Sequence, residues 1–473
     1  MASGIVAWGT YLPYWRLDRK AIGLALGSPA GRGTRTVASY DEDTTTLGVE
    51  AARRALGSAA APTPETLLFS TPAPAYLDKT NAAAIHAALG LQQAVGAYDM
   101  VGSSRSGWAA IQSAAVMGAA HPALAVVADL RTGLAGGPEE REGADGAAAF
   151  VFAPDGAVVE TLGHAASSQE FLDRWRTPGE SDSHVWEERF GEDVYVPLAQ
   201  AAFTDAVKAA GITPGDIDHL IVAGLHTRAV KAARAALGVK PDAHAPDMSQ
   251  TVGNLGAAQS GVALADVLER ATPGQVIAVL LLADGADAVI LRTTDALPAA
   301  QARHGLSVAA QIAQGRSDLP YATFLTWRGQ LHREPPRRPD PERPGAPVTR
   351  RSELWKYGFN ASRCLACGFR HLPPTRVCLQ CKAIDAMEPE RLAEVEGTVA
   401  TFTIDRLAFS LSPPVIGVVV DFDGGGRYRC EMTDADPDAV RIGTRVQMTF
   451  RRIYTAQGVH NYFWKAKPLE GSV

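Results

Sequence analysis

Four of the five cysteines form two closely spaced pairs in the last quarter of the sequence. Cys364-x-x-Cys367 is followed, after ten residues, by Cys378-x-x-Cys381. Two such pairs can hold one Zn²⁺ between four thiolates in a closed structural site, whereas a redox motif needs only one pair in a thioredoxin-like context. The spacing therefore predicts structural zinc. Cys430 lies outside the spacing and is expected to be a buried strand residue.

A serine-rich loop precedes a predicted helix in the first half of the chain. The loop, Gly102-Ser103-Ser104-Arg105-Ser106-Gly107, follows an extended run, and we expect the helix to open from Trp108. The start of a helix favours an anion or oxyanion, because its backbone N–H groups are free and the dipole is positive there. Ser104 is a candidate nucleophile. Alternatively, Ser103, Ser104 or Ser106 serves only as the helix cap.

Two polar residues of the second half could complete such a site. His226 follows a strand predicted over 220–223, and strand ends are where α/β folds usually bind ligands, so His226 is a candidate general base. Asn254 lies in Val252-Gly253-Asn254-Leu255-Gly256, before another predicted helix. The alternative for Asn254 is ordinary turn chemistry, because Asn and Gly are common turn residues.

The first 334 residues alternate apolar runs with amphipathic segments, which is typical of an α/β fold with mostly parallel strands. The predicted buried strands are Leu67–Ser70, Leu124–Asp129, Leu220–Ala223 and Val276–Ala283. The order of elements also repeats. Leu89 and Leu237 close similar Ala-Ala-Leu-Gly segments 148 residues apart, and Gly107 and Gly256 lie 149 apart. A duplicated unit would place the loops of Ser104 and Asn254 in related positions; Ala-rich composition alone is the alternative.

A proline- and arginine-rich stretch divides the chain. We expect a large domain over 1–334, an extended linker without a helix over 335–351, a zinc ribbon over 352–388 and an OB-fold domain over 389–473. The last domain is predicted from five short strands and a Gly424-Gly425-Gly426 turn, which suggest an all-β barrel.

Composition limits the classes of function. The net charge is −6, and residues 352–473 hold 15 Lys and Arg against 14 Asp and Glu, a balance of +1, so we expect no nucleic-acid binding. The N-terminus lacks the pattern of a signal peptide, and the longest apolar stretch, 276–291, is interrupted by Asp284 and Asp287. We therefore expect a cytoplasmic protein that does not bind a membrane.

The large domain resembles the thiolase superfamily, most closely hydroxymethylglutaryl-CoA synthases of archaeal and bacterial type. The residues that carry the resemblance are Gly4-Ile5-Val6, Tyr11-Leu12-Pro13, Asp41-Glu42-Asp43-Thr44, Trp175-Arg176, His226, Gly253-Asn254 and Tyr321-x-x-Phe324-Leu325-x-Trp327-Arg328. The resemblance implies a duplicated five-layer α/β fold, a homodimer, and catalytic residues at Ser104, His226 and Asn254. Ser104 occupies the position of the family's nucleophilic cysteine, and the family's catalytic glutamate falls near Pro72.

The zinc ribbon and OB barrel resemble an acyl-CoA-associated family that partners thiolases. Together the resemblances imply an acyltransferase acting on acyl-CoA or acyl-carrier-protein thioesters through an acyl-serine at Ser104, with His226 as base. Hydroxymethylglutaryl-CoA formation is expected to be absent or weak, because Pro72 cannot move a proton. A retro-aldol lyase and a non-catalytic acyl-CoA-binding scaffold are the alternatives.

Overall fold

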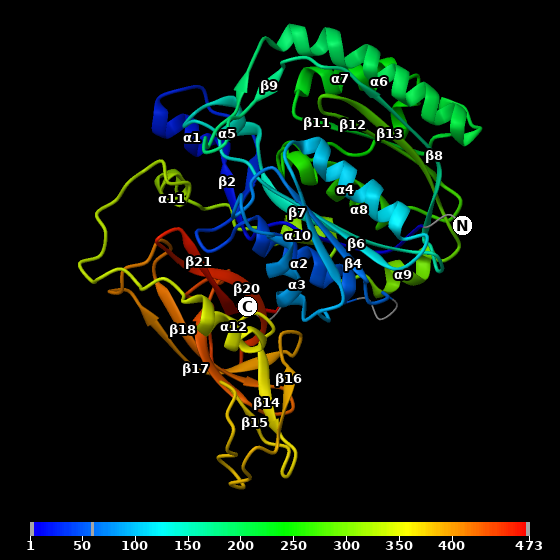
Figure 1. Ribbon diagram of the computed structural model, residues 1–473. Helices are drawn as coiled ribbons and strands as arrows, with labels where there is room; N and C mark the ends of the chain where they lie inside the picture. Colours follow the sequence, from blue (N-terminus) through cyan, green and yellow to red (C-terminus); the bar gives the residue numbers. More distant parts are fainter. Residues whose placement is uncertain (1–3, 58–60, 470–473) are drawn as a thin grey trace. The chain divides into compact units, whose positions relative to one another are not determined.

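The computed structural model describes residues 4–57 and 61–469, and the chain forms two compact units (Figure 1). Unit 1 consists of Met1–Ala38, Glu50–Ala83 and Gln93–Phe324, and unit 2 of Ser39–Val49, Ala84–Gln92 and Leu325–Val473. The chain therefore enters unit 2 twice before the C-terminal part begins. Within the described ranges, no helix combines the length and the apolar character needed to cross a membrane.

Unit 1 is built on one nine-stranded sheet. In spatial order its strands are β11 (His219–Gly224), β12 (Val276–Leu282), β13 (Gly285–Thr293), β8 (Val159–Ser168), β1 (Gly4–Tyr11), β7 (Asp145–Ala153), β6 (Ala123–Leu130), β4 (Thr66–Thr71) and β5 (Gly96–Val101). Equivalent strands follow one another outward from the central β8–β1 pair: β8, β13, β12 and β11 on one side correspond to β1, β7, β6 and β4 on the other. His244 forms a parallel bridge with Leu220 of β11, as β5 pairs with β4. This pseudosymmetry confirms the predicted duplication.

The four predicted strands of the large domain are present, but the sheet is mixed rather than mostly parallel. Of the eight neighbouring pairs, only β4–β5, β4–β6 and β11–β12 are parallel. The prediction failed because it did not recognise the antiparallel partners β7 and β13. A two-residue connection joins β12 to β13, and so short a connection allows only an antiparallel pair.

Helices and half-sheets of unit 1 form the expected five layers (Figure 1). The central helices α4 (Ser104–Met117) and α8 (Gln259–Leu268) share one apolar core with strands of both halves. Outside the second half-sheet, α6 (Glu188–Ala210) and α7 (Thr227–Ala236) bury a second core. On the opposite side β1 lies so close to α2 (Thr44–Leu56) that a Cβ on Gly9 would overlap the helix backbone.

Shorter elements complete unit 1 and its connections to unit 2. They are α1 (Arg19–Leu26), α3 (Ala82–Leu89), α5 (Pro138–Glu142), α9 (Leu297–Arg303), α10 (Val308–Ala313), α11 (Tyr321–Trp327), η1 (Pro214–Asp216), η2 (Pro241–Ala243), η3 (Gly256–Ala258), β2 (Trp15–Asp18), β3 (Thr34–Val37), β9 (Arg174–Trp175) and β10 (His184–Val185).

Unit 2 contains a small three-stranded sheet and a closed five-stranded barrel. Its elements are α12 (Ala346–Arg351), α13 (Glu353–Lys356), β14 (Asn360–Cys364), β15 (Arg370–His371), β16 (Met387–Arg391), β17 (Gly397–Asp405), β18 (Val415–Phe422), β19 (Arg427–Met432), β20 (Arg445–Ala456) and β21 (Val459–Pro468). Burial alternates along β18, as expected for a barrel strand. The five predicted strands are confirmed.

The expectation of a helix-free linker is wrong at its end. α12 begins at Ala346, inside the predicted linker 335–351, and Pro347 lies in its first turn. Proline is tolerated there, because the first N–H groups of a helix have no partner within the helix.

Candidate functional site

Ser104 is the first residue of α4, and its hydroxyl has no hydrogen-bond partner among the described residues. The cap is Ser103, whose Oγ accepts a hydrogen bond from the backbone N–H of Arg105 at 3.2 Å. The helix therefore begins four residues before the predicted Trp108, and the capping role falls to Ser103. Ser104 is only 6% exposed. A buried hydroxyl without a partner is uncommon in proteins and is available for a reactant.

Asp129 is the second-to-last residue of β6, a strand that packs against α4. One turn into the helix, a Cβ on Gly107 would lie 2.8 Å from Cγ1 of Val127. Ser104 lies N-terminal to this contact on α4, and Asp129 lies C-terminal to it on β6. Asp129 and Val127 are two residues apart, so their side chains lie on the same face of the strand. Both directions lead to the carboxyl edge of the parallel strands β4, β5 and β6. The Ser104 hydroxyl and the Asp129 carboxylate thus belong to the same edge.

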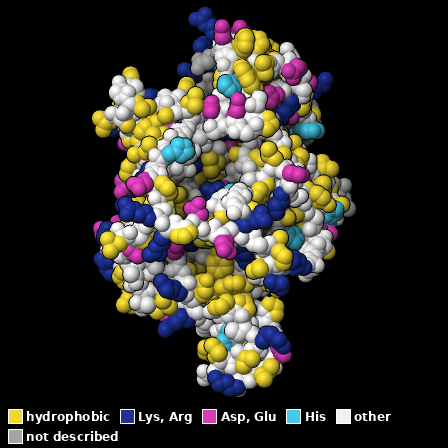
Figure 2. Space-filling view, turned by 60° about the vertical axis from the view of Figure 1, so that its left-hand side comes forward, with side chains coloured by type: hydrophobic (Ala, Val, Ile, Leu, Met, Phe, Trp, Pro, Cys, Tyr) yellow, Lys and Arg dark blue, Asp and Glu magenta, His cyan; other side chains and the backbone are white. Residues whose placement is uncertain are grey.

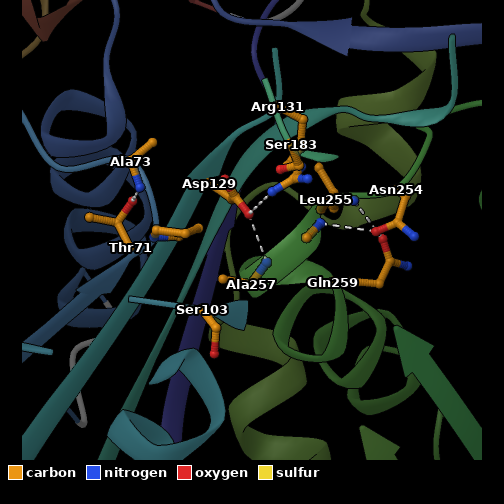
Figure 3. A network of polar contacts seen from close by, with 12 residues as sticks. Thr71, Ala73, Ser103, Asp129, Arg131, Ser183, Asn254, Leu255, Ala257 and Gln259 are labelled. Carbon is orange, nitrogen blue, oxygen red and sulfur yellow. Dashed lines mark hydrogen bonds and ion pairs between the residues drawn. The ribbon is translucent and has the colours of Figure 1, made fainter. Parts of the chain in front are cut away.

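Asp129 links the two halves of unit 1 (Figure 3). Its Oδ2 accepts a hydrogen bond from the backbone N–H of Ala257 at 2.9 Å and lies 3.6 Å from Nη1 of Arg131. Its Oδ1 has no partner in the described chain, although the residue is fully buried. Burial raises the pKa of this carboxyl, and Arg131 only partly opposes the shift. A buried carboxylate with one free oxygen can accept and return a proton.

His226 is placed as a hydrogen-bond donor. It caps α7, and its Nδ1 accepts the backbone N–H of Ala229 at 3.0 Å. The neutral ring therefore carries its proton on Nε2, which can donate a hydrogen bond but cannot take up another proton. This geometry opposes the predicted role of His226 as the base for Ser104. Nε2 has no partner among the described residues, so its N–H is free for a ligand.

An acidic group faces His226 across Gly191. A Cβ on Gly191 would lie 2.5 Å from Nε2 of His226 and 2.8 Å from Oδ1 of Asp173. The ring of Tyr195 is 6.0 Å from that of His226. Burial raises the pKa values of both Asp173 and Tyr195. Asp173 therefore lies on the Nε2 side of the histidine ring.

Asn254 lies before α8, in the position that the duplication predicts. Its Nδ2 donates to the carbonyl of Gly224 at 2.8 Å, and its Oδ1 accepts the N–H of Gly256 at 3.0 Å. The side chain thus fixes the end of β11, from which His226 follows. Asn254 also borders a cavity of about 700 Å³, whose charged and titratable lining residues are Arg19, Glu142, Lys231, Arg234, His244 and Asp247.

Pro72 directly follows β4 on the other side of the site. The carbonyl of Pro72 accepts a hydrogen bond of 2.5 Å from Nη2 of Arg176. Figure 3 shows Thr71 and Ala73, which flank Pro72, on one side of Asp129, and Asn254 on the other. The site is therefore bounded by β4 of the first half and by the loop of Asn254 in the second.

The structure brings Ser104 and Asn254 to the helix starts on either side of Asp129, and His226 to the end of β11. The sequence reasoning missed Asp129 and Arg131. One signal could have found Asp129: it is the last residue of a predicted strand, and His226 was chosen because it follows a strand end closely. Nothing in the sequence showed that Oδ1 of Asp129 would be left without a partner.

The four paired cysteines form a second site, in unit 2. Their sulfur atoms all lie within 4.8 Å of one another; Cys364 and Cys381 are 3.7 Å apart, and Cys367 and Cys378 are 3.6 Å apart. A tetrahedral Zn²⁺ with Zn–S bonds of about 2.3 Å requires sulfur–sulfur distances of about 3.8 Å. The donor set and its dimensions therefore fit a structural zinc ion.

Comparison with known proteins agrees with both units. The C-terminal domain of 3-oxoacyl-[acyl-carrier-protein (ACP)] synthase III matches residues 207–291, and the C-terminal OB-fold domain of ChsH2 matches residues 390–451. A hydroxymethylglutaryl-CoA synthase of Caldivirga maquilingensis is 30% identical over 317 residues, covering 63% of this chain and 90% of the relative. That of Methanocella arvoryzae is 28% identical over 316 residues, covering 64% and 91%.

Solved structures share the fold of the large unit. MvaS in complex with 3-hydroxy-3-methylglutaryl coenzyme A aligns with a TM-score of 0.60 and 21% identity, over 72% of this chain and 95% of that one. FabH from Pseudomonas aeruginosa PAO1, a 3-oxoacyl-(acyl carrier protein) synthase III, aligns with a TM-score of 0.56 and 21% identity, over 62% and 99%.

The duplicated sheet and the helix starts that face each other define a thiolase-type α/β fold, followed by an OB-fold domain. The chain belongs to the hydroxymethylglutaryl-CoA synthase family. Its relatives are acyltransferases of the thiolase fold.

Proposed function

We propose that the protein transfers acyl groups from CoA or acyl-carrier thioesters through an acyl-serine at Ser104. The observation that carries the proposal is the buried Ser104 hydroxyl, which lies at the start of α4 and has no partner in the described chain, while Ser103 caps the helix. By resemblance, Ser104 stands where the family has its nucleophilic cysteine. A serine needs a base to react, since its hydroxyl does not ionise near neutral pH.

Asp129 supplies the base in this mechanism, in place of the predicted His226. Oδ1 of Asp129 takes the proton of the Ser104 hydroxyl as Oγ attacks the thioester carbonyl carbon. The resulting oxyanion is stabilised by the Nε2–H of His226 and by backbone N–H groups at the start of α4. When the C–S bond breaks, the departing thiolate receives the proton from Asp129, and the acyl group remains on Ser104.

The carrier portion of the thioester is assigned to the cavity that Asn254 borders. Arg19, Lys231 and Arg234 line this cavity together with two acids, Glu142 and Asp247. The remaining positive charge suits the phosphates of CoA or of phosphopantetheine. Figure 2 shows Lys and Arg interspersed with Asp and Glu over one face of the molecule. This face therefore carries no continuous basic surface of the kind that nucleic acid requires. A homodimer remains our prediction from the family resemblance.

Pro72 argues against condensation of an acetyl group. The resemblance places the family's catalytic glutamate near this residue, and a proline side chain cannot remove a proton from an acetyl methyl. The Pro72 carbonyl is itself engaged by Arg176. We therefore expect acyl transfer without formation of hydroxymethylglutaryl-CoA.

The test is incubation of the full chain with a panel of acyl-CoAs, followed by intact-mass measurement. We expect a one-to-one acyl adduct that Ser104→Ala abolishes and that Ser106→Ala, in the same helical turn, retains. Carbon–carbon cleavage without an adduct would replace the proposal with the lyase alternative. Binding with neither adduct nor cleavage would favour the scaffold alternative.

Ser104→Cys tests the same site by a substitution that should increase acylation rather than abolish it. The helix start lowers the pKa of a thiol, so this variant should be acylated readily. It should still fail to condense acetyl-CoA with acetoacetyl-CoA, because Pro72 provides no base. Efficient condensation by the variant would show that another residue replaces the missing glutamate. It would then favour hydroxymethylglutaryl-CoA synthase activity over simple acyl transfer.

A further inference from the structure

Three arginines lie at the β4 and β6 side of the site, and one of them forms no ion pair within hydrogen-bond distance among the described residues. Arg131 pairs with Asp129 and Glu139, and Arg174 lies 3.5 Å from the same Glu139. Within the described chain, Nη2 of Arg176 donates a hydrogen bond to the carbonyl of Pro72, which is neutral. Its Nε and Nη1 atoms remain without a partner there.

The neighbouring acids compensate Arg176 only in part, because the Asp129 carboxylate that attracts it also serves other partners. Asp129 is engaged by Ala257 and Arg131, and Glu139 is shared by Arg131 and Arg174. Arg176 itself is half-buried, so water solvates it incompletely. A partly buried guanidinium with two free N–H directions favours a carboxylate or phosphate oxygen pair, which it can bind in a bidentate manner.

The position of Arg176 indicates which part of a thioester it would meet. Its anchor, Pro72, directly follows β4, where Thr71 pairs with Val101 at the end of β5. Only Gly102 and Ser103 separate β5 from Ser104. Arg176 is therefore anchored at the end of β4, and Figure 3 shows Thr71 and Ala73, which flank this anchor, on the other side of Asp129 from Asn254.

We infer that the acyl group carries a terminal carboxylate that Arg176 binds, so that the substrates are monothioesters of short dicarboxylic acids. This inference rests on the proposed function, because it takes Ser104 as the centre to which the acyl carbon is bound. Arg176 then acts as a specificity residue. It holds the distal end of the acyl chain while the thioester end lies at Ser104.

Binding can be measured without turnover in full-length Ser104→Ala protein. Each dicarboxylyl-CoA is compared by calorimetry with an isostere in which an isopropyl group replaces the carboxylate: malonyl with 3-methylbutanoyl, succinyl with 4-methylpentanoyl, and glutaryl with 5-methylhexanoyl. For at least one pair, we expect the acid to bind about tenfold to a hundredfold more tightly, as a charge-assisted hydrogen bond would provide.

Variants assign that preference to Arg176. Arg176→Gln should abolish it, Arg176→Lys should retain part of it, and Arg292→Gln, at an exposed position of β13, should leave it unchanged. Equal binding of every acid and its isostere by Ser104→Ala protein would overturn the inference. An unchanged preference in Arg176→Gln, or an equal loss in Arg292→Gln, would do the same.

The two proposals fail in different ways. If Arg176 determines a preference in binding but no acyl-CoA leaves an adduct on the wild-type chain, the carboxylate site stands and acyl transfer fails. If adducts form at equal rates from acids and isosteres, and binding shows no preference, acyl transfer stands and the carboxylate site is refuted.

Discussion

At the scale of single residues, the site depends on which polar atoms are left without partners. Ser103 and Ser104 are chemically identical, and capping alone separates them: Ser103 bonds to the helix backbone, while Ser104 keeps a free hydroxyl. The sequence indicated a serine at this helix start. It could not select between them, because the cap depends on where the helix begins. The ring orientation of His226 was equally beyond the sequence, since it is fixed by a hydrogen bond from Ala229.

Gly256 is required beside Asp129. Its φ is +55°, and a Cβ there would overlap Oδ2 of Asp129. Gly274 has a similar conformation, with φ of +85°, but a Cβ on Gly274 would meet no atom within 4 Å. Gly274→Ala should cost about 1–2 kcal/mol of unfolding free energy from backbone strain, whereas Gly256→Ala should cost about 1–3 kcal/mol more and displace the carboxylate.

Chemical denaturation and intact-mass acylation together check the Gly256 prediction. Acylation should fall at least tenfold in Gly256→Ala and stay near the wild-type rate in Gly274→Ala. A Gly256→Ala protein that acylates normally would mean that the position of Asp129 does not matter for the reaction.

The pH dependence of acylation follows from Asp129. Its pKa is raised by burial, and it must be ionised to take the proton of Ser104. The acylation rate should therefore fall as the pH is lowered through this raised pKa, and level off above it. Asp129→Asn should reduce the rate about 10²–10⁴-fold and remove that inflection. Rapid-quench acylation between acidic and neutral pH measures both; an unchanged profile in Asp129→Asn would exclude Asp129 as the base.

At the scale of elements, duplication explains where the functional residues lie. Pro72 and His226 follow equivalent strands, β4 and β11, and Ser104 and Asn254 stand at the starts of equivalent helices, α4 and α8. The spacing of small residues predicted this relation. The antiparallel strands β7 and β13 escaped prediction, because a continuous apolar run does not reveal the direction of its partner.

The predicted zinc ribbon gives a testable expectation at the scale of elements. Metal analysis should find one zinc per chain, and Cys367→Ala should lose it while Cys430→Ala, the fifth cysteine, keeps it. Chelation should unfold the ribbon, because structural zinc supplies much of the folding free energy of such small modules. Hydrogen exchange should then rise over residues 360–391 but not over the buried strand β12. Full zinc in Cys367→Ala would contradict the four-cysteine assignment.

At the scale of the whole molecule, the two units are not successive stretches of chain. Proline content predicted a boundary near residue 334, yet unit 2 also contains Ser39–Val49. In that segment Asp41 is 2.9 Å from Nζ of Lys465, and Glu42 pairs with Arg451. The sequence showed these acids only as part of the family resemblance, because their basic partners lie more than 400 residues away.

The last prediction concerns the buried pair of Glu42 and Arg451, whose side chains are both 0% exposed. Arg451 pairs with Asp434 as well, so Arg451→Met removes the guanidinium from two buried carboxylates and should cost about 3–5 kcal/mol. Arg429→Met, at an exposed position of β19, should change stability by less than about 0.5 kcal/mol. Denaturant unfolding measures both variants.

Hydrogen exchange identifies the segments that lose stability in Arg451→Met. Because the backbone N–H of Arg452 also bonds to the carbonyl of Asp41, Arg451→Met should expose amides 39–49 together with β20. Adding Glu42→Gln should recover part of the lost stability, since the double variant leaves only Asp434, the other acid paired with Arg451, without its guanidinium partner. Additive losses in the double variant would mean that the two side chains stabilise the unit independently. The segment 39–49 would then not be held in the barrel by this ion pair.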